Sequence, residues 1–230
     1  MILSIIVPVF NEERHLQSVL EQLVSLKLYH GFSKQIIVVD DNSTDLSDKI
    51  IKDFITFFSK ENILHIRNNE NKGKGFCLRL GLEHVIGDLV IFHDADLEYD
   101  TNNINKLLEF LITKQLDAVY GNRYGQKEVH QTKLFLFANK LISFLYNIKA
   151  STKLPDVETC HKLIKTKFLK NLSLSEDNFG IEIELSRQLD KIEGIKIDSI
   201  PILYNARSYN SGKKIGFTDG IRALWCLLKY

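Results

Sequence analysis

Leu89-Val90-Ile91-Phe92-His93-Asp94-Ala95-Asp96 is the stretch that decides the fold of this 230-residue chain. Its first four residues form an uninterrupted apolar run of strand length, which is typical of a strand buried in a parallel sheet. The run opens directly into two carboxylates, Asp94 and Asp96. In an open α/β sheet, ligands bind beyond the carboxyl ends of the strands. The stretch therefore predicts a buried strand that ends at a ligand site.

Short apolar runs of the same kind alternate with amphipathic segments of helix length through the first half of the chain. The predicted strands are residues 3–9, 35–39, 63–66, 88–92 and 118–120, and the predicted helices are residues 13–26, 46–58, 75–85 and 103–113. This alternation is typical of βαβ units. We therefore predict an α/β fold: a Rossmann-like, mostly parallel sheet with helices on both faces.

The second half of the chain has a different pattern. After Gly121 it predicts a long apolar helix, a turn around Pro155-Asp156, a helix near residues 181–189, a strand at residues 195–200 and a terminal helix. A chain of 230 residues that is 44% hydrophobic suits one compact domain. We predict a single domain over residues 1–230, in which residues 1–120 bind the ligand and residues 121–230 form an elaboration over the crevice.

The composition argues against several classes of protein. Thirty basic and 29 acidic residues give a net charge of +1, so no nucleic-acid partner is expected. Cys77, Cys160 and Cys226 form no CxxC pair, which fits a reducing cytoplasm better than a disulfide framework or a zinc site. No window reaches the ~18 uninterrupted apolar residues of a membrane span, and the apolar run at residues 2–9 is too short for a signal peptide. We expect neither a span nor export.

Three polar clusters follow predicted strands: Phe10-Asn11-Glu12, Asp40-Asp41-Asn42-Ser43 and Asp94-Ala95-Asp96. Because the carboxyl ends of parallel strands share one edge of the sheet, these clusters are expected to converge on one crevice. The last cluster offers carboxylates that suit Mg²⁺ or Mn²⁺ beside phosphate oxygens. The alternative interpretation is a solvated acidic turn, since Asp is a common turn residue.

Two further stretches are candidates for contacts with a nucleotide. Ser43 or Asp45 caps the helix that follows, which leaves Asp40 and Asp41 to accept hydrogen bonds from a ribose or a base. Lys72 and Lys74 belong to Asn71-Lys72-Gly73-Lys74-Gly75, a glycine-containing helix start that predicts a phosphate contact. It lacks the spacing of a P-loop.

Together these residues resemble the family 2 glycosyltransferases of GT-A fold, over essentially the whole chain. The matching stretches are Ile6-Val7-Pro8-Val9-Phe10-Asn11-Glu12, Val38-Val39-Asp40-Asp41-Asn42-Ser43-Thr44-Asp45, Asn71-Lys72-Gly73-Lys74-Gly75 and Asp94-Ala95-Asp96-Leu97-Glu98-Tyr99-Asp100. Within the family, the chain looks most like the dolichyl-phosphate and polyprenyl-phosphate sugar synthases. That likeness rests on Gly121-Asn122-Arg123-Tyr124, Asp156-Val157-Glu158-Thr159-Cys160-His161-Lys162 and Arg207-Ser208-Tyr209-Asn210-Ser211-Gly212-Lys213-Lys214.

The resemblance implies a role for each matching residue. Pro8, Phe10, Glu12 and Asp40 would contact the nucleoside, and Asp94, Asp96 and Glu98 would hold the metal and the diphosphate. The further donor contacts would come from Asp41, Lys72, Lys74, Arg207, Lys213 and Lys214. The family often has Tyr at position 10, and the branch often has Ser at position 122 and an aromatic residue at position 161.

The implied activity is inverting transfer of a hexose from a GDP- or UDP-linked sugar to a polyprenyl or dolichyl phosphate, with Mg²⁺ or Mn²⁺. A metal that spans the two phosphates neutralises the charge on the leaving nucleoside diphosphate. A phosphate acceptor is already ionised near neutral pH, so no general base is needed. Cations must instead align two anions, and the candidates are Arg123, Arg207, Lys213 and Lys214. The alternative for the last three is a solvated loop.

Two apolar segments bear on location, residues 134–146 and residues 217–230. Both are too short or too interrupted to span a bilayer, and they suit the membrane interface. The alternative is packing on the core or on a second subunit. With a lipid acceptor implied, we predict peripheral association with the cytoplasmic face of a membrane.

Two other functions remain open. One is transfer to a glycan hydroxyl, which needs a carboxylate base and assigns that role to Asp156 or Glu158. The other is a catalytically silent module that binds a nucleotide sugar, because a fold does not guarantee turnover.

Overall fold

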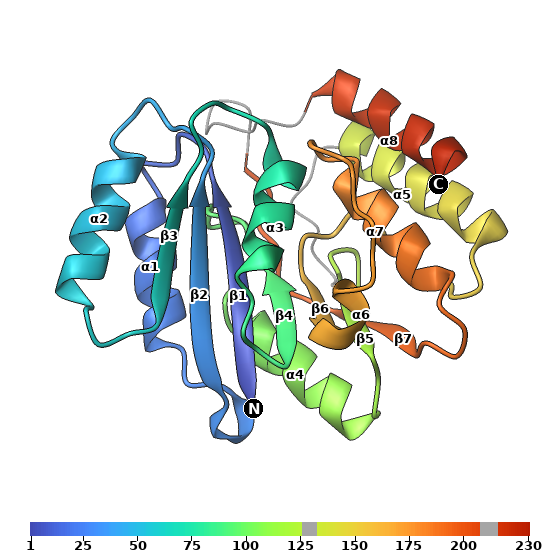
Figure 1. Ribbon diagram of the computed structural model, residues 1–230. Coiled ribbons are helices and arrows are strands. Elements are labelled where there is room, and N and C mark those ends of the chain that lie inside the picture. Colours follow the sequence, from blue (N-terminus) through green and yellow to red (C-terminus); the bar gives the residue numbers. More distant parts are fainter. Residues whose placement is uncertain (126–132, 208–215) are drawn as a thin grey trace.

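The computed structural model describes residues 1–125, 133–207 and 216–230 (Figure 1). Its centre is a seven-stranded sheet of order β3-β2-β1-β4-β6-β5-β7. The strands are β1 (Ile2–Val9), β2 (Ser33–Asp40), β3 (Ile63–Arg67), β4 (Leu89–Phe92), β5 (Ala118–Asn122), β6 (Lys162–Lys165) and β7 (Ile197–Pro201). The predicted α/β class and mostly parallel sheet are confirmed.

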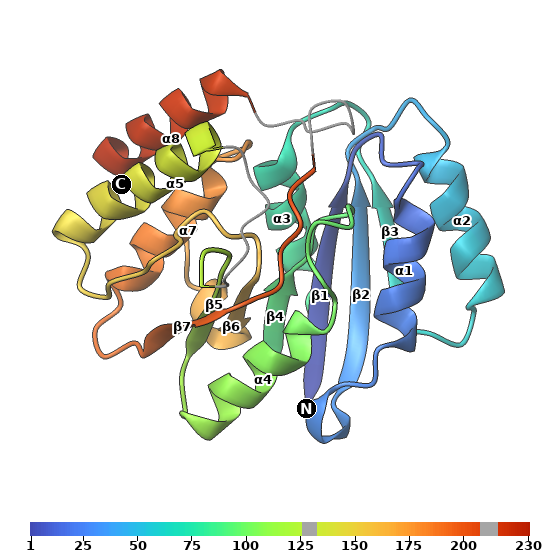
Figure 2. The ribbon, with the colours of Figure 1, turned by 180° about the vertical axis from the view of Figure 1, so that it is seen from behind.

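The helices lie where the apolar spacing predicts them, except for a single turn at Thr166–Leu169 that the sequence did not predict. They are α1 (Leu16–Ser25), α2 (Ser47–Phe57), α3 (Lys74–Glu83), α4 (Asn103–Thr113), α5 (Lys133–Lys149), α6 (Thr166–Leu169), α7 (Ile181–Asp190) and α8 (Phe217–Lys229), with a short 3₁₀ turn at Tyr29–Gly31. Helix α3 covers one face of the sheet, while α1 and α4 cover the other (Figures 1 and 2). The apolar strands are thereby buried on both faces.

Strand β6 departs from the predicted pattern. It pairs antiparallel with β4 on one side and with β5 on the other. Its four residues, Lys-Leu-Ile-Lys, are too short and too polar at their ends to indicate a strand on their own. The pairing partners on both sides create it, because they satisfy its backbone groups and bury Lys162 completely.

The sheet sets the position of α3, whose first residue is Lys74. A Cβ atom at Gly81 would overlap the side chain of Ile6, so only glycine lets this helix lie so close to β1. The close approach brings the start of α3 to the carboxyl ends of β1 and β2.

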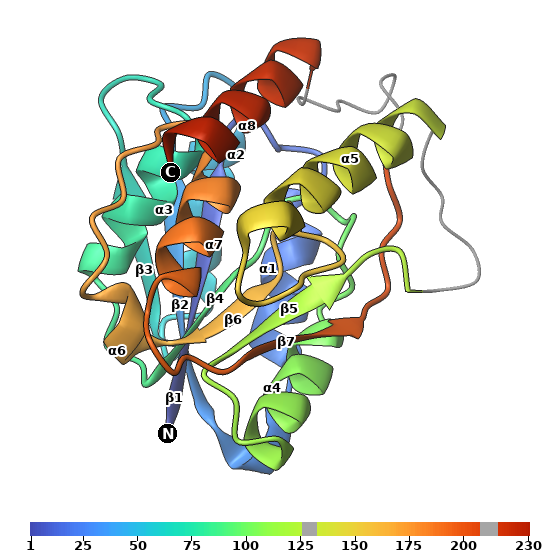
Figure 3. The ribbon, with the colours of Figure 1, turned by 90° about the vertical axis from the view of Figure 1, so that its right-hand side faces the viewer.

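Helices α5 and α8 contact each other beside α7, beyond the β5–β7 end of the sheet (Figure 3). Within residues 1–125, 133–207 and 216–230, no helix combines the length and apolarity needed to cross a bilayer. Both helices nevertheless leave large apolar side chains exposed: Phe137, Leu141, Phe144 and Ile148 on α5, and Ile221, Leu224, Trp225 and Leu228 on α8.

Candidate active site

A cavity of about 290 Å³ lies at the carboxyl ends of β1, β2 and β4. The three polar clusters that follow these strands meet there, together with residues from the second half of the chain. The cavity is lined by Pro8, Val9, Phe10, Glu12, Asp41, Asn71, Gly73, Lys74, Cys77, Asp94, Ala95, Asp96, Glu98, Asn178, Phe179 and Arg207. Acidic and basic side chains therefore face one another across a small, partly apolar space.

Asp94 is neutralised by Lys74. The Nζ atom of Lys74 lies 2.8 Å from Asp94 Oδ1 and 3.2 Å from Glu182 Oε1. Burial alone lowers the pKa of Lys74, but the charges of Asp94 and Glu182 outweigh it and raise that pKa well above its ordinary value. Burial raises the pKa of Asp94, and the Lys74 ammonium reverses this and lowers it. Lys74 is thus a protonated cation aimed at the first carboxylate of the loop.

Asp96 is paired with Arg207. The guanidinium reaches Asp96 Oδ2 at 2.6 Å and holds both oxygens of Glu12, at 3.0 and 3.2 Å. Burial, together with the charges of Asp94 and Glu98, raises the pKa of Asp96 to about 7, although Arg207 opposes the shift. Asp96 therefore carries its negative charge at a cost, which an additional cation would relieve.

The segment that contains Arg207 also fixes Glu98. The backbone N–H of Arg207 donates to Glu98 Oε1 at 2.7 Å, and the hydroxyl of Tyr204 donates to Glu98 Oε2. The backbone N–H of Glu98 in turn donates to Asp96 Oδ1 at 3.1 Å. These bonds tie the acidic loop to a segment more than 100 residues later in the sequence.

Asp94, Asp96 and Glu98 are the residues that the sequence predicts as metal ligands. All three line the same cavity and offer only oxygen donors, which Mg²⁺ and Mn²⁺ prefer. Burial, and after it the charges of Asp94 and Glu98, raises the pKa of Asp96 to about 7. A divalent ion placed among these oxygens would stabilise the ionised form of Asp96.

The two acidic residues after β2 have different surroundings. Asp41 lines the cavity, and its carboxylate accepts bonds from the backbone N–H groups of Lys72 and Gly73 at 2.9 and 2.7 Å. Asp40 is fully buried, and its Oδ1 accepts bonds from the N–H and the hydroxyl of Ser43. The sequence suggested nucleoside contacts from both Asp40 and Asp41. Of the two, Asp41 lines the cavity and Asp40 does not, because successive residues leave a strand on opposite sides.

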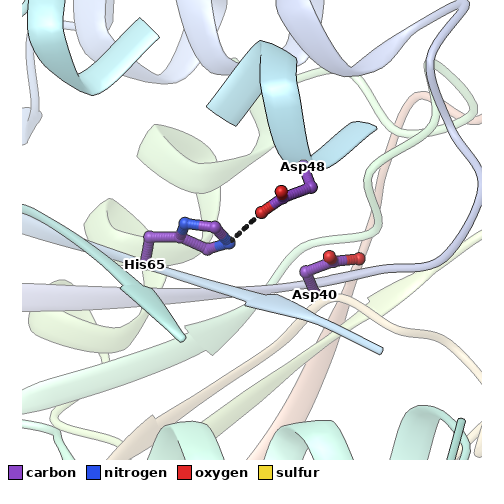
Figure 4. A group of neighbouring side chains, drawn as sticks. All are labelled: Asp40, Asp48 and His65. Atoms are coloured by element: carbon purple, nitrogen blue, oxygen red, sulfur yellow. Dashed lines mark ion pairs between the residues drawn. The ribbon is translucent and has the colours of Figure 1, made fainter. Parts of the chain in front are cut away.

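Asp40 belongs to a second cluster, which includes two residues that the sequence did not single out, Asp48 and His65 (Figure 4). One ligand atom from each lies within 4.8 Å of the others, so the cluster is a possible Asp-Asp-His metal site. Arg67 already brings positive charge to it, with Nη1 2.6 Å from Asp48 Oδ2 and Nε 3.4 Å from Asp40 Oδ2. None of Asp40, Asp48 and His65 lines the cavity that contains Asp94 and Asp96.

Two cations named from the sequence lie elsewhere. Arg123 forms a bidentate pair with Asp156, through Nε and Nη2 at 2.7 Å each. Lys72 lies over the ring of Phe76 at 4.7 Å. Neither is among the described residues that line the cavity. Lys213 and Lys214 fall outside the described residues.

Three cavity neighbours from the second half were missed in the sequence: Asn178, Phe179 and Glu182. The first two line the cavity, and Glu182 forms an ion pair with Lys74. Gly75 lets their segment approach the start of α3, because a Cβ atom there would overlap the carbonyl oxygen of Glu176. Residues from both halves of the chain line the cavity, and the roles predicted for residues 1–120 and 121–230 stay predictions.

Position 161, where an aromatic residue was expected by resemblance, has a histidine in an aromatic role. The His161 ring stacks on Tyr99 with centroids 4.3 Å apart, and its Nε2 lies 2.8 Å from Nδ1 of His93. Burial lowers the pKa of His93 to about 4 and that of His161 well below its ordinary value. Both rings are therefore neutral, and they support the strand end that leads into Asp94.

The sequence matches the family model described as glycosyl transferase family 2 over residues 4–173. An uncharacterised protein of Methanocaldococcus jannaschii is 32% identical over 221 residues, which are 91% of this chain and 93% of that protein. The dolichol-phosphate mannosyltransferase of Pyrococcus furiosus is 25% identical over 238 residues. That match covers 100% of this chain but 64% of the relative, so the chain spans less than two thirds of its length.

Solved structures share the fold at low sequence identity. Glucosyl-3-phosphoglycerate synthase from Mycobacterium tuberculosis, in complex with Mn²⁺, uridine diphosphate and phosphoglyceric acid, superposes with a TM-score of 0.68 at 19% identity, covering 99% of this chain and 77% of that one. TarS of S. aureus with UDP-GlcNAc gives 0.64 at 18%, covering 99% and 65%. The chain belongs to glycosyltransferase family 2 and has the GT-A fold.

Proposed function

We propose that the protein transfers a hexose, with inversion, from a GDP- or UDP-linked sugar to a polyprenyl or dolichyl phosphate, and that it needs Mg²⁺ or Mn²⁺. The observation that carries the proposal is the cavity in which Asp94, Asp96 and Glu98 face Lys74 and Arg207. Carboxylates that bind a metal and cations that bind phosphate oxygens are the two requirements of a metal–diphosphate site.

Each group in the cavity has a defined task in this proposal. The metal, when bound by Asp94, Asp96 and Glu98, supplies Lewis-acid stabilisation of the leaving diphosphate. Lys74 and Arg207 orient the phosphate oxygens through charge-assisted hydrogen bonds. Asp41, fixed by the backbone of Lys72 and Gly73, accepts hydrogen bonds from the nucleoside. Phe10 packs against the base without the hydroxyl that Tyr supplies at this position.

The phosphate acceptor is supported by relatives and by the surface. Undecaprenyl-phosphate 4-deoxy-4-formamido-L-arabinose transferase of Pectobacterium carotovorum is 32% identical over 107 residues, which are 46% of this chain and 32% of that enzyme. On this chain, α5 and α8 contact each other, and each exposes large apolar side chains. A lipid-linked acceptor is presented at a membrane surface, and an apolar face of this kind binds there.

The decisive experiment supplies purified protein and Mn²⁺ with radiolabelled GDP- and UDP-hexoses and a polyprenyl phosphate. We expect acid-labile label in the lipid fraction. Label found only in an added glycan would assign a hydroxyl acceptor instead. No transfer with any donor, despite binding, would make the protein a nucleotide-sugar-binding module.

The hydroxyl-acceptor alternative has one observation in its favour, and it concerns Glu158. Burial raises the pKa of Glu158 to about 7, in the range that suits a general base, whereas Asp156 is held by Arg123. If a hydroxyl is the acceptor, kcat/KM rises with pH through about 7 as Glu158 ionises, and Glu158→Gln lowers it by roughly 100-fold or more. For a phosphate acceptor we expect Glu158→Gln to change kcat less than about fivefold. Comparing the two pH–rate profiles with each acceptor class decides between them.

We also propose that α5 and α8 bind the cytoplasmic face of a membrane. Phe144 is 63% exposed and Leu228 is 82% exposed, one on each helix. Replacing both by Ser is expected to weaken sedimentation with polyprenyl-phosphate-containing vesicles by at least about tenfold, since each buried side chain contributes roughly 1.5–3 kcal/mol. Phe57→Ser is the matched control, because Phe57 is 81% exposed on α2. Vesicle binding that survives the double change, or a dimer that the change dissociates, would assign the face to protein contact.

A further inference from the structure

A chain of charges of alternating sign runs from the acidic loop into the second half of the protein. Lys74 Nζ lies between two carboxylates, 2.8 Å from Asp94 and 3.2 Å from Glu182. The other oxygen of Glu182 accepts a hydrogen bond from Lys162. Each charge in this chain thus has a neighbour of opposite sign, which is the condition for keeping charges inside a protein.

The two partners of Lys74 are not equivalent. Glu182 is fixed, because Lys162 is completely buried and also donates to the carbonyl oxygen of Thr159 at 2.6 Å. Asp94, by contrast, lines the cavity and is open to a ligand. Lys74 therefore has one permanent partner and one partner that a ligand can take from it.

A divalent metal needs the oxygens that the protein's own cations hold. In the structure Asp94 is paired with Lys74 and Asp96 with Arg207. A metal at Asp94 repels the ammonium group of Lys74, so the two compete for the same carboxylate. A diphosphate changes this balance, because its oxygens accept hydrogen bonds from Lys74 while the metal takes Asp94.

We propose that Lys74 is an exchangeable counter-ion: it occupies Asp94 in the free protein and transfers to the donor diphosphate when the metal binds, while Glu182 keeps it in the cavity. The inference rests on the proposed function, which supplies the nature of the donor. To that function it adds an exchange of partners by Lys74 when the donor and the metal bind. Free metal meets a carboxylate that is already paired, whereas the metal–diphosphate complex supplies a partner for every charge. The site thereby selects the complex over either component.

Lys74→Met tests this directly, because removing the competitor has opposite effects on the two ligands. Binding of Mn²⁺ alone, followed by the electron paramagnetic resonance signal of the free ion, is expected to tighten roughly fivefold. Binding of GDP or UDP in the presence of Mn²⁺, measured by calorimetry, is expected to weaken at least about tenfold. A simple metal ligand or a purely structural lysine would not produce opposite signs.

Glu182→Gln tests the role of the fixed partner. Without Glu182, Lys74 pairs only with Asp94, so we expect Mn²⁺ alone to bind more weakly than in the unaltered protein. Glu182→Gln alone leaves the buried Lys162 ammonium group without its carboxylate partner. The double change Lys162→Met with Glu182→Gln is therefore measured beside it, because it removes both charges and leaves no uncompensated charge in the core. Lys49→Met, which removes an exposed lysine paired with Asp53, is the control and is expected to change neither affinity.

Two failures are distinguishable in this design. Unchanged or weaker Mn²⁺ binding by Lys74→Met overturns the counter-ion, whatever the nucleotides do. Absence of GDP and UDP binding in the unaltered protein with Mn²⁺ overturns the proposed function. Even then, comparing Mn²⁺ binding by the unaltered protein and by Lys74→Met still tests whether Lys74 competes with the metal for Asp94.

Discussion

Asp96→Asn is expected to lower metal-dependent sugar transfer by about three orders of magnitude, since removing an electrostatic contact to the transition state typically costs 10²–10³ in kcat. The change replaces one carboxylate oxygen of the proposed metal site with an amide and leaves the shape of the side chain intact. Arg207 keeps its contacts with Glu12 and Glu98, so the loop retains its attachment to the second half of the chain.

The stability of the same variant is expected to move in the other direction. Because burial and the charges of Asp94 and Glu98 raise the pKa of Asp96 to about 7, its ionised form is unfavourable in the metal-free protein. Asp96→Asn should therefore unfold at a temperature equal to or above that of the unaltered protein at pH 8, as followed by circular dichroism. Asp53→Asn, on an exposed helix face, is the control for transfer. Full metal-dependent transfer by Asp96→Asn would remove Asp96 from the site.

The second large effect is on the free energy of unfolding. Arg123→Met is expected to destabilise the protein by about 3–5 kcal/mol, because it leaves Asp156 as an unpaired charge that is 1% exposed. Asp156 loses two side-chain hydrogen bonds of 2.7 Å and, among the described residues, keeps the one from the backbone N–H of Arg123 at 3.1 Å. Urea unfolding of the two proteins measures the difference.

The double change Arg123→Met with Asp156→Asn separates structure from chemistry. With both charges removed, most of the lost stability is expected to return. The sequence suggested that Arg123 aligns the acceptor phosphate; if so, the stable double variant still has a raised KM for polyprenyl phosphate. A double variant with normal KM and normal kcat would leave Arg123 a structural role only.

Much of the fold follows from periodicity. The apolar runs at residues 3–9 and 88–92 become β1 and β4, and the helical spacing at residues 103–113 becomes α4 without a shift at either end. These segments are predictable because strand and helix periods are local properties of a dozen residues. Strand β6 was not predictable in this way, since its four residues acquire strand structure only between β4 and β5.

The candidate site divides along the same line. The sequence alone predicted that Asp94 and Asp96 stand at the end of a buried strand and that the polar clusters after β1 and β2 converge with them, because the carboxyl ends of parallel strands share one edge of a sheet. Only the tertiary structure decided which cations meet them. Lys74 reaches Asp94 and Arg207 reaches Asp96 across long stretches of sequence, and Arg123 is taken by Asp156. Buried charges must find partners wherever packing brings the chain together, and no local pattern records that choice.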